Sequence, residues 1–518
     1  RIMIRRGLIF GVPHTPEYIN WLKETLSPGS IVGLDSRFFS VALIRHIKDS
    51  LADSGIRLDT SASLLAEVWR DRPGLPTGPV FDHPVGYAGH SREEKLSLVR
   101  SALENQNSDY LFITPLDEVA WLFNLRGNDI PFCPLFIAYA LVGLNEAILF
   151  VHPGKIPVEL ANRMVSEGIR LADYDRCEEV LLQIPEGSTV SLAPEKTNGA
   201  VYETIASRAF IREGMNITTA LKAVKNATEI ARLKEVMIRD GVAWVKTLQE
   251  IDHKLAQGEE LTEIGIARRI AYFRSLEEDY QGESFHPISS FGPHGAVVHY
   301  SVTDETSIQV GPVGIYLLDS GGQFTGGTTD TTRTVVLGEP TPEQQRDFTL
   351  ALKGTLGVSM LRFPAGTRGY QIDVLARLAL WNEGRNYGHG TGHGVGFFLN
   401  VHEGPQTIGA SASGYMQVTL EPGMVTTVEP GFYVEGAYGV RTENMTLVVP
   451  DIETPYGTFY RFETLTLVPI DRRLIDMALL TSSELDWLNR YHLTVRRWLV
   501  PRLEEPVRHW LERATEPL

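Results

Sequence analysis

The chain has 518 residues, of which 43% are hydrophobic, and it carries a formal net charge of -16 at pH 7. This length exceeds that of one domain and predicts roughly three, and the acidic balance, with no long basic stripe, argues against a nucleic-acid partner. Two cysteines, Cys133 and Cys177, are too few for a disulfide framework or a thiolate metal site. We therefore expect an acidic globular protein of a reducing compartment, the cytoplasm.

Residues 1–80 alternate short apolar strands with amphipathic helical stretches. The run 31–34 is typical of a strand, and 17–26 and 41–51 have helical periodicity. The chain opens with RIMIRRGLIF, which lacks an initiator methionine and reads as the interior of a strand. We therefore predict an N-terminal α/β domain over 1–80 whose true start lies further upstream.

A linker and a second α/β domain follow. Residues 71–89 are dense in proline and glycine, which is typical of a linker. The most apolar run, 134–151, contains Asn145 and Glu146, so it is interpreted as a core strand and turn, and no membrane span is predicted. The second domain is assigned to 81–216, with a helix over 92–105, a strand over 110–114 and a helix near 157–168.

The remaining residues, 217–518, are assigned to a third domain. Two long helical stretches are predicted first, over 222–255 and 261–276. Strands bounded by glycine-rich turns follow, and they carry the acidic residues and histidines that indicate a metal site.

Two aspartates flank the first of these turns. An apolar run over 315–318 ends in Asp319, and the segment SGGQFTGGTT then leads to Asp330, which predicts a strand, a turn and a second strand. If the hairpin tip falls at residues 324–325, antiparallel pairing sets Asp319 opposite Asp330. Both carboxylates could then reach one ion or a pair of ions.

The stretch 386–405 reads NYGHGTGHGVGFFLNVHEGP and holds three histidines among six glycines. So many glycines exclude a regular helix, so His389 and His393 are not the helical histidine pair of an HExxH site. We predict instead an extended, kinked strand, with His402 after it. Because histidine is a common metal ligand, carboxylates are expected to complete a site.

Two glutamates lie in a further predicted hairpin. Residues 424–429 and 440–449 read as strands around a turn at 435–437. Glu429 ends the first strand, and Glu443 lies within the second. The two hairpins and the histidine stretch thus supply four carboxylates and one imidazole to a single predicted site.

The order of these residues resembles the five-ligand dinuclear centre of the pita-bread metallopeptidases: Asp319, Asp330, His393, Glu429 and Glu443. The motifs HGTGHGVG, FLNVHEGP and VEPGFY are similar to aminopeptidase P, the X-Pro aminopeptidase, and the likeness extends to LDEVAWLFNLRG and LTLVPI. It implies the long, three-domain form of that enzyme, which has a mixed α/β and α+β fold. Two creatinase-like N-terminal α/β domains would precede a C-terminal pita-bread domain.

The resemblance also implies two divalent metal ions, with manganese as the expected metal. Asp319 would serve one ion, and His393 with Glu429 the other. Asp330 and Glu443 would bridge the two. The donor set alone suits Mn²⁺, Co²⁺, Fe²⁺ or Zn²⁺. A water between two such ions loses its proton near neutral pH and becomes a hydroxide nucleophile, and Glu429 would pass that proton to the leaving nitrogen.

Four residues carry implied substrate roles. His299, within an alternating run interpreted as a strand, and His402 match family positions that contact the substrate and stabilise the oxyanion. His389 matches a proton-shuttling position on the substrate side. Arg441 shares a predicted strand face with Glu443 and matches a basic residue that orients it. Considered singly, each of these residues could instead have a structural role: a histidine could be hydrogen-bonded in the core, and the arginine could form a simple salt bridge.

The predicted activity is metal-dependent release of the first residue from peptides whose second residue is proline. Proline has no amide hydrogen and fixes φ, so the bond before it needs a dedicated pocket. Candidate pocket walls are Phe397, Phe398 and Tyr433, although the two phenylalanines fit a core better.

Three alternatives stay open at this point. Prolidase cuts only X-Pro dipeptides, methionine aminopeptidase lacks two upstream domains, and some pita-bread proteins bind peptides or histones without catalysis. The motif FLNVHEGP and the extra second domain favour the aminopeptidase, and the full ligand set argues against a non-catalytic protein. The resemblance further implies a homodimer formed through the C-terminal domain.

Overall fold

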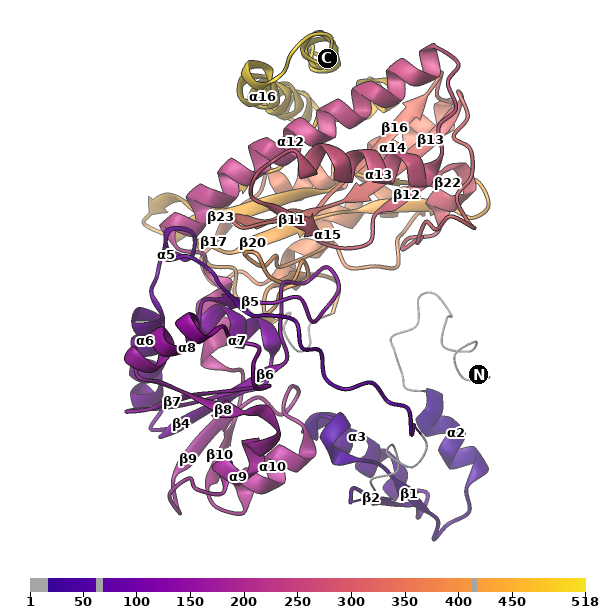
Figure 1. The fold of residues 1–518 in the computed structure, drawn as a ribbon. Helices are drawn as coiled ribbons and strands as arrows, with labels where there is room; N and C mark the ends of the chain where they lie inside the picture. The colour runs from indigo at the N-terminus through magenta and orange to yellow at the C-terminus, as the bar shows by residue number, and fades with distance from the viewer. Residues whose placement is uncertain (1–16, 62–68, 412–416) are drawn as a thin grey trace. The chain divides into compact units, whose positions relative to one another are not determined.

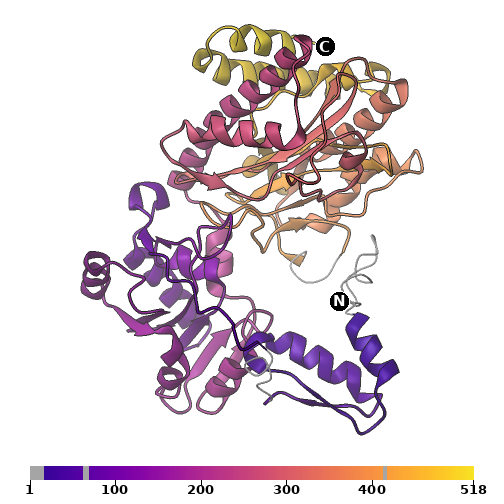
Figure 2. The same ribbon diagram turned by 45° about the vertical axis from the view of Figure 1, so that its right-hand side comes forward.

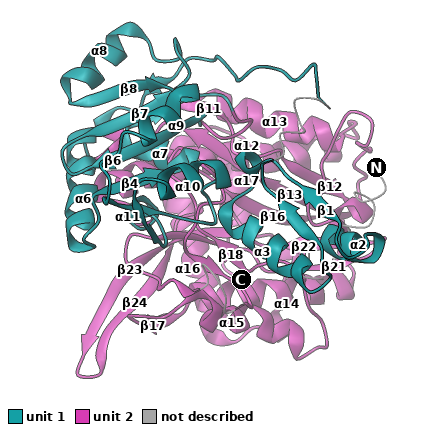
Figure 3. Cartoon of the chain, turned by 90° about the horizontal axis from the view of Figure 1, so that it is seen from below, with its two compact units in different colours: residues 1–85, 90–129, 135–222 teal, residues 86–89, 130–134, 223–518 magenta. Residues whose placement is uncertain are grey.

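The computed structural model describes residues 17–61, 69–411 and 417–518, which form two compact units (Figure 3). Unit 1 comprises residues 1–85, 90–129 and 135–222, and unit 2 comprises 86–89, 130–134 and 223–518. The strand expected at the start of the chain lies outside the described residues.

The first part of unit 1 has the predicted α/β pattern. Ser40 starts a helix because its side chain accepts a hydrogen bond from the Leu43 amide. Ile47 and Leu51 of that helix are buried in a small apolar core. The elements are α2 (Glu17–Thr25), β1 (Ile31–Gly33), α3 (Val41–Ala52) and β2 (Arg57–Asp59), with β1 and β2 parallel.

A six-stranded mixed sheet forms the centre of the second part of unit 1, in the order β10-β9-β4-β6-β7-β8. The apolar run 134–151, expected as a core strand and a turn, forms two buried antiparallel strands of this sheet. Among the described residues, no helix is long and apolar enough to span a membrane. The strands are β4 (Tyr110–Ile113), β6 (Ala138–Gly143), β7 (Ala147–Val151), β8 (Ile169–Asp173), β9 (Thr189–Leu192) and β10 (Phe210–Glu213).

The helices predicted around this sheet are confirmed. Helix α6 (Arg92–Asn105) begins at a capping box formed by Ser91 and Glu94, and α8 (Val158–Ser166) lies where a helix was expected. The other elements here are β3 (Phe81–Asp82), α5 (Val85–Ala88), α7 (Leu116–Leu122), β5 (Leu125–Arg126), α9 (Cys177–Leu181), α10 (Gly199–Ala206) and α11 (Ile217–Ala223).

Unit 2 combines strands with long covering helices. Helix α12 (Ala227–Ala256) begins later than predicted, because Asn226 and Glu229 form a capping box at that point. Helix α13 (Glu263–Ser275) follows. The C-terminal helices α16 (Ser482–Leu499) and α17 (Val507–Ala514) pack beside α12 (Figures 1 and 2).

The central strands of unit 2 are buried along almost their whole length. Trp244 of α12 and Ile270 of α13 pack on Tyr316 in β13 (Gly314–Ser320). A second cluster joins Ile315 of the same strand to Leu352 of α14 (Pro342–Ser359). Apolar contact around the strand explains its continuous hydrophobic run, and this run ends at Asp319.

The strands of unit 2 form small sheets that carry the candidate site at their ends. One sheet has the order β12-β13-β16, a second β11-β14-β15, and a third β17-β24-β23-β20, while β18-β19 and β21-β22 are pairs. Their bounds are β11 (Tyr280–Glu283), β12 (Ile288–Phe291), β14 (Gly322–Phe324), β15 (Gly327–Thr328), β16 (Thr331–Leu337), β17 (Arg362–Pro364), β18 (Gly392–His393), β19 (Thr407–Ile408), β20 (Val425–Val428), β21 (Gly431–Val434), β22 (Tyr438–Arg441), β23 (Asn444–Thr454) and β24 (Gly457–Thr464), with α15 at Gly369–Trp381.

Candidate metal centre

The first hairpin differs in register from the expectation. Phe324 pairs with Gly327, so the tip lies one residue later than predicted, and Asp319 pairs with Thr332. Gly327 follows the tip at φ +152°, a conformation suited to glycine. Moving the tip by one residue shifts the pairing by two, which preserves the face. Asp330 is therefore a diagonal neighbour of Asp319 on the same face instead of its direct partner.

The second hairpin consists of two strand pairs instead of one. Strand β20 pairs with β23, and β21 with β22, in one continuous register that is interrupted at residues 429–430 and 442–443. Pro430 has no amide hydrogen to give to the ladder. Glu443 was predicted to lie within a strand, but it lies between β22 and β23. The register places it across from Glu429.

At this interruption, the backbone amides of the second hairpin donate hydrogen bonds to carbonyls of other segments. The Glu429 amide donates to the Thr391 carbonyl at 2.8 Å, and the Glu443 amide donates to the Thr332 carbonyl at 3.1 Å. These bonds tie the second hairpin to the glycine-rich segment and to the first hairpin. The three acid-bearing and histidine-bearing segments are thus joined through their backbones.

His393 sits where the glycine-rich segment crosses the second hairpin. Residues 386–405 contain no helix, as predicted. A Cβ added at Gly392 would lie 1.9 Å from the Thr427 carbonyl oxygen, and one at Gly394 would lie 2.0 Å from that of Glu403. The glycines beside His393 are thus required by close backbone approach.

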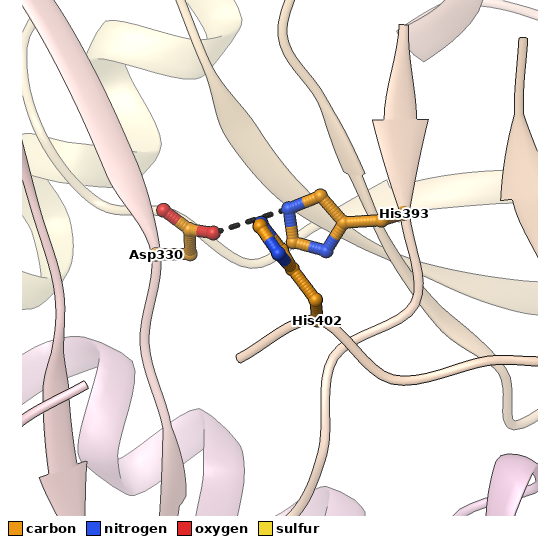
Figure 4. Close-up of side chains that lie close together, drawn as sticks. All are labelled: Asp330, His393 and His402. Atoms are coloured by element: carbon orange, nitrogen blue, oxygen red, sulfur yellow. Dashed lines mark ion pairs between the residues drawn. The ribbon is translucent and has the colours of Figure 1, made fainter. Parts of the chain in front are cut away.

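The His393 side chain points at two carboxylates. Its Nε2 lies 3.3 Å from Asp330 Oδ2 and 3.5 Å from Glu429 Oε1. His402 stands edge-on beside it, with ring centroids 4.1 Å apart and an interplanar angle of 76° (Figure 4). Asp330 and both imidazoles therefore converge on one point.

All five predicted ligands are brought together. Three overlapping groups each offer ligand atoms within 4.8 Å of one another: Asp330, His393 and His402; His393, Glu429 and Glu443; and Asp319, Asp330 and Glu443. Asp330 and Glu443 share the last group with Asp319, and His393 links the other two. The geometry fits two adjacent cation sites with shared carboxylates.

The electrostatics of the cluster fit cations as well. Asp319 and Glu443 are 7% and 1% exposed, and the buried Asp319 Oδ1 has no hydrogen-bond partner. Burial raises the pKa of Asp319 to about 6 and that of Glu429 to about 7. Burial and the charge of Asp330 raise the pKa of Glu443 well above its ordinary value. Buried carboxylates this close need protons or cations to neutralise them.

His393 is drawn toward its charged form by the same carboxylates. Burial by itself lowers the pKa of this imidazole. The hydrogen bond to Asp330 and the charge of Glu429 outweigh burial and raise the pKa to about 9. Divalent cations would displace that proton and leave the neutral imidazole that binds metal.

Arg441 contacts Asp319 directly and is linked through Thr332 to Glu443, the carboxylate that it was expected to orient. Its Nη2 donates to Asp319 Oδ2 at 2.7 Å, and its Nε donates to the Thr332 hydroxyl at 3.1 Å. Thr332 in turn donates to Glu443 Oε2 at 2.7 Å. Sequence reasoning missed Thr332, although its position two residues after Asp330 places it on the same strand face.

Tyr433 joins Arg441 to His389. Arg441 Nη1 donates to the Tyr433 hydroxyl at 2.7 Å, and that hydroxyl lies 2.9 Å from His389 Nε2. Burial, then the charge of Arg441, lowers the pKa of His389 to about 3. His389 is therefore neutral at physiological pH, and its Nε2 accepts a hydrogen bond from the Tyr433 hydroxyl.

His299 does not lie in a strand, which corrects the interpretation of its alternating sequence. The residues before it form a 3₁₀ turn, Gly292–Ala296, and His299 follows in a loop. The buried carboxylate of Glu263 accepts hydrogen bonds from the Phe291 and Ile308 amides and so fixes both ends of this loop. Burial and the charge of Arg441 lower the pKa of His299.

Comparison with known proteins identifies the family. Residues 71–229 match the Creatinase/Prolidase N-terminal domain, 225–450 match metallopeptidase family M24, and 458–518 match the C-terminal region of peptidase M24. Probable Xaa-Pro aminopeptidase P of Coprinopsis cinerea is 37% identical over 98% of this chain and 85% of its own, and that of Tuber melanosporum is 36% identical over 98% and 86%.

A solved structure agrees with these relatives. The X-prolyl aminopeptidase of Caenorhabditis elegans, described as a cytosolic enzyme with a di-nuclear active site, has a TM-score of 0.91. It is 32% identical and covers 98% of this chain and 84% of its own. The predicted fold, creatinase-like α/β domains followed by a pita-bread domain, is confirmed. The chain belongs to metallopeptidase family M24 and, within it, to the Xaa-Pro aminopeptidases.

Proposed function

We propose that this protein is a metal-dependent aminopeptidase that hydrolyses the first peptide bond of substrates with proline at the second position. The single observation that carries the proposal is the set of overlapping ligand groups assembled from two hairpins and a glycine-rich segment. The full-length similarity to Xaa-Pro aminopeptidases supports the reaction.

The proposed ligand assignment is the one that the resemblance to the dinuclear metallopeptidases implies, and the three overlapping groups of ligand atoms support it. Asp319 would hold one ion, His393 and Glu429 would hold the other, and Asp330 and Glu443 would serve both. We propose Mn²⁺ as the metal, which the oxygen-rich donor set accommodates. When bound, two such cations supply a water-derived nucleophile at neutral pH and polarise the peptide carbonyl.

The protein side chains then position the substrate and move protons. Glu429 accepts a proton at Oε1 or Oε2 and delivers it to the departing proline nitrogen. His299 and His402 are neutral at physiological pH, because burial lowers both pKa values, that of His402 to about 4. Each neutral imidazole keeps one N–H, which can donate to the developing oxyanion. His389, hydrogen-bonded to Tyr433, relays protons on the substrate side.

The preference for proline requires a wall that accepts its ring. Phe397 and Phe398 are 2% and 1% exposed and belong to the core, as the sequence favoured. Tyr433 is the remaining aromatic candidate, because its hydroxyl lies between Arg441 and His389. We propose that its ring faces the proline of the substrate.

Further parts of the proposal concern organisation and location. We propose three domains at residues 1–80, 81–216 and 217–518, a homodimer formed through the C-terminal domain, and a cytoplasmic location. The related C. elegans enzyme is described as cytosolic. The low cysteine content supports a reducing compartment.

The test uses protein stripped of metal with a chelator and then supplied with Mn²⁺. We expect Mn²⁺ to restore cleavage of a tripeptide with proline second, but not of the same tripeptide with alanine second. Turnover of the X-Pro dipeptide alone would instead indicate a prolidase. Equal cleavage with and without metal would contradict the proposal.

Two matched variants sharpen this test. Asp330→Asn should abolish Mn²⁺-dependent activity, because it removes a bridging carboxylate. Asp347→Asn is the control, since Asp347 is a buried aspartate of α14 that accepts a hydrogen bond from Tyr438 and takes no part in the cluster. The control should retain activity.

A further inference from the structure

The segment that carries His389 has little structure of its own to hold it. Between residues 386 and 393, only Gly392–His393 pairs as a strand. Glycines alternate along it, so its backbone has wide conformational freedom. The position of His389 must therefore be fixed by side chains from elsewhere in unit 2.

Arg377 of α15 supplies part of that support. Its Nη1 donates to the Tyr387 carbonyl at 2.8 Å, and its Nη2 donates to the His389 carbonyl at 2.9 Å. Its guanidinium carbon lies 4.0 Å from the centroid of the Tyr387 ring. The side chain is buried, so these contacts are shielded from water. One planar guanidinium thus donates hydrogen bonds to the backbone on both sides of Gly388.

Asp373, one turn earlier on the same helix, completes the arrangement. Its Oδ2 accepts from Arg377 Nε at 2.7 Å, and its Oδ1 accepts from the Thr391 hydroxyl at 2.6 Å. Thr391 is fully buried, and its carbonyl accepts a hydrogen bond from the Glu429 amide. Helix α15 is therefore connected to His389 through Arg377, and to Glu429 through Asp373 and Thr391.

We propose that Asp373, Arg377 and Thr391 form a brace that sets the position of His389 relative to Glu429. The inference rests on the proposed function, in which these two residues move protons. All three are positioning residues, because they act through the backbone of the site and not on the substrate. Misplacing a reacting group by about 1 Å can cost on the order of 100-fold in rate.

An ordinary stabilising ion pair would not have these contacts. The Lys353 and Glu484 side chains, for example, form a pair that joins α14 to α16. The brace instead ends on backbone groups of two site residues. Loss of the brace should therefore lower kcat strongly, whereas loss of an ordinary ion pair should lower only the thermal midpoint.

The experiment compares Arg377→Met, Arg377→Lys and Thr391→Val with Arg496→Met. Arg496 is the matched control, an arginine of α16 that donates to the Glu512 carbonyl and the Thr515 hydroxyl in α17 and the residue after it. For each variant, kcat and KM are measured at saturating Mn²⁺, together with the thermal midpoint. Hydrogen exchange of the peptide spanning 386–393 is followed by mass spectrometry.

We expect Arg377→Met to lower kcat by about 10- to 100-fold with little change in KM. Arg377→Lys should recover part of kcat, because lysine can pair with Asp373 but cannot grip two carbonyls as well. Thr391→Val keeps the volume, loses the hydroxyl and should lower kcat too. Exchange across 386–393 should rise in Arg377→Met and in Thr391→Val, whereas Arg496→Met should lower the midpoint without lowering kcat.

Unchanged kcat in Arg377→Met, or an equal loss of kcat in Arg496→Met, would overturn the brace. Should Arg377→Met fail to fold, Thr391→Val decides in the same way. Absence of X-Pro cleavage by the wild-type protein would refute the proposed function alone. Hydrogen exchange still tests the brace in that case, and unchanged exchange in Thr391→Val would refute it.

Discussion

Removal of metal is predicted to make the stability of unit 2 fall as the pH rises. In the metal-free fold, burial raises the pKa of Asp319 to about 6 and that of Glu429 to about 7. The folded state then binds more protons than the unfolded state from about pH 4 to about pH 7, so the free energy of unfolding decreases across this range. His393 acts in the same direction, because its raised pKa of about 9 makes it lose a stabilising proton above neutrality.

The size of the effect follows from these values. The ordinary pKa values are 3.8 for Asp319 and 4.5 for Glu429. At about 1.4 kcal/mol per pKa unit, each raised value lowers the free energy of unfolding at pH 8 by about 3 kcal/mol. Because the two groups interact, their joint effect is on the order of 5 kcal/mol. That corresponds to a fall of roughly 10 °C in the thermal midpoint.

The assay measures thermal midpoints at pH 5, 6.5 and 8, with a chelator or with Mn²⁺. Bound cations take the place of the protons, so the difference between the Mn²⁺-loaded and metal-free midpoints should widen as the pH rises. Asp330→Asn removes a charge that raises the pKa of Asp319, Glu429 and Glu443. The same change removes the hydrogen bond that raises the pKa of His393. Asp330→Asn should therefore make the metal-free midpoint fall less between pH 5 and pH 8, while losing the stabilisation by Mn²⁺.

Two outcomes would refute this reasoning. One is a metal-free midpoint that lies as close to the Mn²⁺-loaded midpoint at pH 8 as at pH 5. The other is an Asp330→Asn variant whose metal-free midpoint falls as steeply between pH 5 and pH 8 as that of the wild type. Asp347→Asn again serves as the control: Asp347 lies outside the cluster, so the difference between the Mn²⁺-loaded and metal-free midpoints should still widen as the pH rises.

Three further predictions concern single residues. Arg441→Lys keeps the charge but cannot hold its three partners together, so kcat should fall by about 10- to 100-fold in steady-state kinetics; unchanged kcat would contradict the role of the guanidinium. Gly394→Ala places a Cβ 2.0 Å from a carbonyl oxygen, whereas Gly388→Ala meets nothing within 4 Å. A melt should show a loss of about 1–3 kcal/mol for the first only. Glu263→Gln removes the carboxylate that accepts hydrogen bonds at both ends of the His299 loop, so kcat/KM should fall. A variant with wild-type kinetics would show that this anchor is dispensable.

The residues that gather at the site were predictable mainly because five possible ligands occur in the order of a known dinuclear centre, and at three of them the local sequence is informative as well. Asp319 ends a continuous apolar strand, His393 lies between glycines that no helix tolerates, and Glu429 precedes a proline that breaks the ladder. These signals depend on the chain within a few residues of each position. The helix over 92–105 was predictable for the same reason, since Ser91 and Glu94 mark its start.

The features that sequence reasoning missed depend on distant contacts. The first hairpin could close at either of two neighbouring tips, and the φ of Gly327 decides between them. The loop of His299 has an alternating, strand-like sequence, but hydrogen bonds to Glu263 from another element bend it. Arg441 lies near Glu443 as expected, linked to it through Thr332, but its direct hydrogen bond to Asp319 was not foreseen. In each case, tertiary structure overrides the local pattern.

The measurement that tests the central claim most directly is anomalous diffraction from crystals grown with Mn²⁺, collected on both sides of the manganese absorption edge. The account predicts two peaks about 3.5 Å apart, with Asp330 and Glu443 between them and His393 beside one of them. A single peak, or peaks remote from these carboxylates, would contradict the dinuclear centre and with it the proposed mechanism.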